Sequence, residues 1–139
     1  MDYETGNEMK KIAKTLALVV GAVLFLIGVL AFLPTGIVGP GGMMIRYAGT
    51  PYVHIVSGLL LMGVSTMGES WAAFGLYMVA AAHALIGGLA YASLDRVGTA
   101  TLFDTLRLTQ VDMVFHGVIA VTLAICGKMN TARQQVIWD

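Results

Sequence analysis

The sequence predicts an all-α integral membrane protein, an antiparallel four-helix transmembrane bundle that forms one domain over residues 1–139. Composition is the first reason, because 58% of the residues are hydrophobic and only 12% are charged, against about a quarter charged in a soluble domain. Four long apolar stretches are the second reason, since roughly 20 apolar residues cross the hydrocarbon core as a helix. Eight basic and eight acidic side chains cancel, which leaves no basic surface for nucleic acid.

The first predicted span, residues 12–33, is an apolar run that stops at Pro34. Lysines lie near its start, as in a signal peptide, but the run is longer than a signal peptide's apolar region and no small-residue cleavage site follows. We therefore expect a span that is retained. The connection after it, residues 35–51, is rich in glycine and proline and has no helical period.

The second and third spans are predicted at residues 52–67 and 71–92, joined by a tight turn that makes them antiparallel neighbours. The next connection, residues 93–110, is more polar, and we expect its middle, residues 100–108, to form a short helix at the membrane surface. The fourth span is predicted at residues 111–127. With four crossings both long connections fall on one side, where they form a cap.

The distribution of basic residues predicts the orientation, because cytoplasmic segments carry the excess of lysine and arginine. Five basic residues flank the first and last spans, and three lie on the two long connections. Both termini are therefore expected in the cytoplasm. The flanking residues are Lys10, Lys11, Lys14, Lys128 and Arg133, and those of the connections are Arg46, Arg96 and Arg107.

Each of the last three predicted spans carries one histidine, namely His54, His83 and His116. Ionisable side chains are costly in hydrocarbon and usually face the interior of the helix bundle, a cavity or a partner. The helical rise places all three in the half of the membrane next to the long connections. Asp112 lies one turn before His116, so we expect its carboxylate to accept a hydrogen bond from that imidazole, as carboxylates do behind metal-binding histidines.

Several interpretations of the histidines stay open. The simplest is interhelical packing through hydrogen bonds worth about 0.6 kcal/mol each. A second is haem b ligation by His83 and His116 from opposite sides of the iron, with His54 as a substitute ligand. A copper or zinc site is less favoured because it needs all three side chains to converge. A proton relay through Asp112 and His116 is less favoured because one pair describes no path across a membrane.

Short motifs in three places resemble one protein family. They are Phe32-Leu33-Pro34 at the end of the first span, Val53-His54-x-x-x-Gly58 after the loop, and Asp112-x-x-x-His116-Gly117 in the last span. These are similar to features of the domain of unknown function 4383 family, small bacterial four-helix membrane proteins. The resemblance covers about residues 14–127 and does not include His83 or the glycines of residues 39–42. It implies four spans and a place in the bacterial cytoplasmic (inner) membrane, and it supplies no activity.

The predicted function is non-catalytic, because no serine–histidine–acid or paired-carboxylate pattern occurs within a span. We expect an accessory or scaffolding subunit that packs against other membrane proteins or itself and requires no cofactor. The alternatives are a b-type haem electron carrier or quinone-site subunit and a small transporter, and lipid or pigment bound between the helices is compatible with each. The tail, residues 130–139, is expected to anchor at the membrane interface. Small residues that suit close helix packing form one face of the third span: Ala80, Ala84, Gly87 and Gly88, followed by Tyr91.

Overall fold

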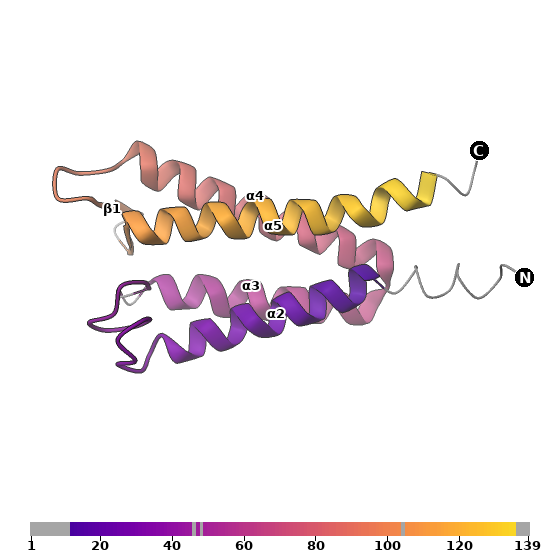
Figure 1. Ribbon diagram of the computed structural model, residues 1–139, viewed down its shortest axis with the longest axis horizontal. Coiled ribbons are helices and arrows are strands. Elements are labelled where there is room, and N and C mark those ends of the chain that lie inside the picture. The colour runs from indigo at the N-terminus through magenta and orange to yellow at the C-terminus, as the bar shows by residue number, and fades with distance from the viewer. Residues whose placement is uncertain (1–11, 46, 48, 104, 136–139) are drawn as a thin grey trace, which may run out of the picture.

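The computed structural model describes residues 12–45, 47, 49–103 and 105–135 (Figure 1). Within these residues the fold consists of four helices, each long and apolar enough to cross a membrane, and one small β-hairpin. The prediction of four helices with the length and composition of membrane spans is confirmed. The helices are α2 (Ile12–Leu30), α3 (Thr50–Met67), α4 (Glu69–Ala92) and α5 (Gln110–Gln135).

The helix ends differ from the predicted spans by a few residues. α2 stops at Leu30, before the predicted end at residue 33, and α5 continues past residue 127. Three of the basic residues that predict the orientation lie outside the described residues, namely Lys10, Lys11 and Arg46. The last four residues of the tail also lie outside them.

The helices form two pairs, because α2 packs mainly on α3 and α4 mainly on α5. Figure 1 shows the two long connections at one end of the molecule, which we call the connection end. The start of α2, the end of α5 and the α3–α4 turn lie at the opposite end. That turn is the single residue Gly68, whose φ of 131° is a conformation that favours glycine.

The connection between α4 and α5 forms a β-hairpin, so the expectation of a short helix there is wrong. β1 (Thr99–Leu102) pairs antiparallel with β2 (Leu106–Thr109). Side chains alternate along both strands between buried and more exposed, which is the period of a strand. The buried side chains, Ala100, Leu102, Leu106 and Leu108, pack with Ala90 and Met113 and so hold the hairpin on α4 and α5.

The small-residue face predicted on the third span is divided between the interior and the surface. Ala80 and Gly87 are buried, and a Cβ on Gly87 would lie 3.3 Å from the carbonyl oxygen of Met113 in α5. Ala84, Gly88 and Tyr91 remain exposed. Within this face Gly87 therefore serves the α4–α5 contact within the chain.

Candidate functional site

The side chains of His54 on α3, His83 on α4 and His116 on α5 meet inside the protein, and each is fully buried. Their ring centroids are 4.7 Å apart for His83 and His116, 5.3 Å for His54 and His116, and 5.7 Å for His54 and His83. We call this group the three-histidine centre. The structure thus brings together all three candidate residues, and the convergence that the sequence could not establish is present.

Hydrogen bonds fix the orientation of two of the rings. The Nδ1 atom of His54 lies 3.0 Å from the backbone carbonyl oxygen of Thr50. A carbonyl only accepts, so His54 Nδ1 carries the proton and its Nε2 carries a lone pair. His83 Nε2 lies 3.2 Å from Ser57 Oγ, and His83 Nδ1 lies 2.7 Å from His116 Nδ1.

The contact between His83 and His116 requires that one proton lie between two nitrogens. If His116 Nδ1 donates, His83 Nδ1 accepts and His83 Nε2 donates to the hydroxyl of Ser57. If His83 Nδ1 donates, its Nε2 accepts from that hydroxyl instead, and the proton of His116 lies on Nε2. Both arrangements satisfy the two hydrogen bonds with neutral rings.

Two nitrogens of the centre have no hydrogen-bond partner although both are buried, namely Nε2 of His54 and Nε2 of His116. Buried polar atoms are nearly always paired, and an unpaired one costs about 1–3 kcal/mol. The ring of Phe115 stacks on His54 with centroids 5.6 Å apart and an angle of 21° between the planes. The centre therefore combines unused nitrogen atoms with an apolar wall.

Asp112 does not make the expected hydrogen bond to His116. Its Oδ1 accepts the backbone N–H of Ile45 at 2.7 Å, and its Oδ2 accepts both the backbone N–H and the hydroxyl of Thr109 at 2.9 Å. The carboxylate is occupied at the start of α5, where the N–H groups of a helix need acceptors. It holds the first long connection against α5 and does not orient the imidazole.

His83 and His116 do not fit haem ligation as they stand. Two axial imidazoles bind iron from opposite faces of a planar macrocycle, whereas these rings are in direct contact through their Nδ1 atoms at 2.7 Å. The two rings would have to separate by the thickness of the macrocycle before haem could bind between them. Among the described residues, no three His, Cys, Asp or Glu side chains are placed to hold a metal ion.

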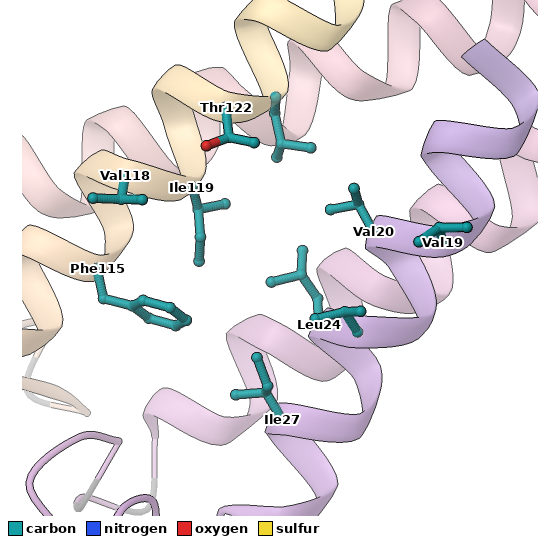
Figure 2. A pocket seen from close by; sticks show the side chains of 10 residues that line it. Val19, Val20, Leu24, Ile27, Phe115, Val118, Ile119 and Thr122 are labelled. Carbon is teal, nitrogen blue, oxygen red and sulfur yellow. The ribbon is translucent and has the colours of Figure 1, made fainter. Parts of the chain in front are cut away.

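An apolar groove between α2 and α5 is the second candidate site (Figure 2). Its cavity volume is about 250 Å³. Figure 2 shows Phe115 and Ile119 of α5 facing the α2 side of the groove, where Val20 and Ile27 lie. Phe115 belongs to both sites, because it lines the groove and stacks on His54. The lining residues are Val19, Val20, Val23, Leu24 and Ile27 of α2, and Phe115, Val118, Ile119, Thr122 and Leu123 of α5.

Sequence reasoning missed the apolar groove as a whole and, around the three-histidine centre, the residues Thr50, Ser57 and Phe115. Ser57 offered a signal, because it is a polar residue three positions after His54 and so lies on the same face of the helix. Phe115 offered none, since an aromatic residue in an apolar span is ordinary.

No family model, curated protein or solved structure matches this chain. The similarity to the domain of unknown function 4383 family therefore depends on the short motifs alone and stays a prediction.

Proposed function

We propose that this protein is a non-catalytic, multi-pass subunit of the cytoplasmic membrane that packs against a transmembrane helix of another membrane protein. In this proposal the four helices form an antiparallel bundle, and the partner lies along α2 and α5. The observation that carries the proposal is the apolar groove between these two helices.

The groove suits protein packing because of what drives helix association in lipid. Lipid tails are as apolar as leucine, so helices associate through close van der Waals packing more than through hydrophobic burial. A helix about 10 Å across occupies roughly 800 Å³ for each 10 Å of its length. A cavity of about 250 Å³ therefore takes the side chains that project from a helix, and the partner's backbone remains outside.

The proposed orientation has the termini in the cytoplasm. Within the described residues, Lys14 lies near the start of α2 and Lys128 in the second half of α5, while Arg96 and Arg107 lie at the connection end. Labelling of a single cysteine at Thr101, in a Cys126→Ser background, tests this. A membrane-impermeant maleimide added to intact cells is expected to label Thr101→Cys, and labelling only after lysis would reverse the orientation.

Photo-crosslinking in native membranes tests the proposed partner surface. A benzophenone amino acid replaces Val118 or Val23 at the groove, whose side chains are 57% and 49% exposed. The matched controls are Leu85 on α4 and Val56 on α3, which are 64% and 60% exposed and do not line the groove. We expect protein adducts at the groove positions only. Adducts to lipid alone, or equal protein adducts at all four positions, would contradict the proposal.

The two alternative functions have weaker support from the geometry. Haem binding requires His83 and His116 to part, and a Soret band that is lost in His83→Ala would nevertheless establish it. Transport of a charged solute usually uses ionisable groups that face a pathway. Among the described acidic residues only Asp112 is buried as a whole, and its oxygens already accept three hydrogen bonds.

A further inference from the structure

We propose that the three-histidine centre binds one transition-metal ion of the copper or zinc class. His54 supplies Nε2, and His83 and His116 supply the two Nδ1 atoms that face each other. This site goes beyond the proposed packing function and does not depend on it.

The distances between the three ring centroids are close to those expected for three imidazoles that bind one ion. A ring centroid lies about 3.1 Å from an ion that its nitrogen binds at about 2.0 Å, so two rings on one tetrahedral or trigonal ion have centroids about 5.1–5.5 Å apart. The observed separations are 4.7, 5.3 and 5.7 Å. One of them lies within that range and the other two lie within about 0.4 Å of it, so three separate helices hold the rings close to the distances that shared ligation requires.

The outer hydrogen bonds of His54 and His83, two of the three histidines, are those of metal-binding histidines. Such histidines donate their second ring N–H to a backbone carbonyl, carboxylate or similar acceptor, which fixes the tautomer and aims the lone pair. His54 donates Nδ1–H to the carbonyl of Thr50 and leaves Nε2 free. His83 can donate Nε2–H to the hydroxyl of Ser57, which leaves the lone pair of Nδ1 facing His116.

Binding of the metal ion requires the rings of His83 and His116 to move slightly apart. Two nitrogens on a tetrahedral ion at about 2.0 Å are about 3.3 Å apart, whereas the Nδ1 atoms of His83 and His116 are 2.7 Å apart. The ion takes the place of the shared proton, which moves to Nε2 of His116, so no proton leaves the site. The two nitrogens must therefore separate by about 0.6 Å, because as the structure stands no three side chains among the described residues are placed to hold a metal ion.

The ligand set selects the class of ion. Neutral imidazole suits copper and zinc, whereas calcium and magnesium prefer oxygen ligands. Three imidazoles leave a fourth position open, as in catalytic zinc sites. Burying a cation is costly without an opposite charge, and the buried carboxylate of Asp112 lies in the first turn of α5, four residues before His116.

Metal loading of the full-length chain tests the site directly. The chain contains three histidines and one cysteine, so purification without a polyhistidine tag makes bound metal attributable to the centre. Protein in nanodiscs is stripped with a chelator, loaded with Zn²⁺ or, anaerobically, with Cu⁺, desalted and analysed by mass spectrometry and X-ray absorption. We expect about one ion per chain for at least one metal, with imidazole nitrogens at about 2.0 Å. Less than about a tenth of an ion for both metals, or a ligand shell without imidazole, would overturn the site.

Variants separate ligation from folding. His54→Ala is expected to abolish stoichiometric binding. Ser57→Ala removes only the hydroxyl behind His83, and loss of such a group weakens metal affinity about 10–100-fold. Ser65→Ala is the matched control, because its hydroxyl bonds the carbonyl of Met62 within α3, away from the centre. Equal affinities of the Ser57→Ala and Ser65→Ala proteins, or stoichiometric binding by His54→Ala, would also overturn the proposal, whatever the crosslinking experiment finds.

Discussion

The two helix pairs are held together by different means. Between α2 and α3 the backbones approach closely through glycine, since a Cβ on Gly58 would lie 2.6 Å from the carbonyl oxygen of Gly21 and from the backbone nitrogen of Phe25. Between α4 and α5 the contact includes a hydrogen bond between His83 and His116. In lipid, both close backbone packing and interhelical hydrogen bonds stabilise helix pairs. The comparison shows that one chain can hold one helix pair by close backbone packing and the other by packing together with a hydrogen bond between side chains.

Substitution of Gly58 is expected to have the largest effect. In Gly58→Leu the side chain collides with backbone atoms of α2, which cannot move aside as a flexible side chain can. We expect loss of a folded monomer in detergent by size-exclusion chromatography. Gly63→Leu is the control on the same helix, because nothing lies within 4 Å of a Cβ there. Similar behaviour of the two variants would show that close α2–α3 packing is not essential.

Substitution of Asp112 is expected to have the second-largest effect, because its carboxylate holds the first long connection against the start of α5. Asp112→Ala leaves the buried N–H of Ile45 without an acceptor, and we expect a loss of about 2–3 kcal/mol in reversible unfolding in mixed micelles. Asp95 is a matched control, since it also accepts hydrogen bonds from a threonine N–H and hydroxyl, but it is exposed. A smaller loss for Asp112→Ala than for Asp95→Ala would contradict this role.

The hydrogen bond between α4 and α5 is expected to make a modest contribution to the free energy of unfolding. A double-mutant cycle of His83→Phe and His116→Phe in metal-free protein should give a coupling energy of about 0.6 kcal/mol, the average for hydrogen bonds in a membrane protein. Both single variants need to unfold reversibly for the cycle to be valid. A coupling energy near zero would mean that the α4–α5 pair depends on its apolar contacts alone.

The smallest effect is expected at the hairpin. The backbone N–H and the hydroxyl of Thr99 donate to Asp95 and hold the pKa of its carboxyl below the ordinary 3.8. Because the folded pKa lies below the unfolded one, the stabilisation is present above about pH 4 and is lost as the pH falls through the folded pKa. The amide resonance of Thr99 should therefore titrate below pH 3.8. In Asp95→Asn it should not titrate.

The sequence predicts the four helices well because long apolar runs reveal length and composition. It does not predict which face of each helix points inward, because lipid and protein interior are both apolar and leave no amphipathic pattern. The meeting of His54, His83 and His116 depends on that rotation. The hydrogen bond from the backbone N–H of Ile45 to the carboxylate of Asp112 also depends on the fold, because it joins residues 67 positions apart. The hairpin was missed because its alternating pattern extends over only four residues in each strand.

The backbone conformation of Ile45 bears on the order in which this chain is inserted and folded. Its φ of 52° is rare for a β-branched residue, its side chain is almost fully buried, and its N–H is held by Asp112. During synthesis residue 45 leaves the ribosome well before residue 112. The strained conformation of the first long connection therefore lacks its acceptor until the last helix has been inserted. Completion of the connection end has to be a late step of membrane insertion.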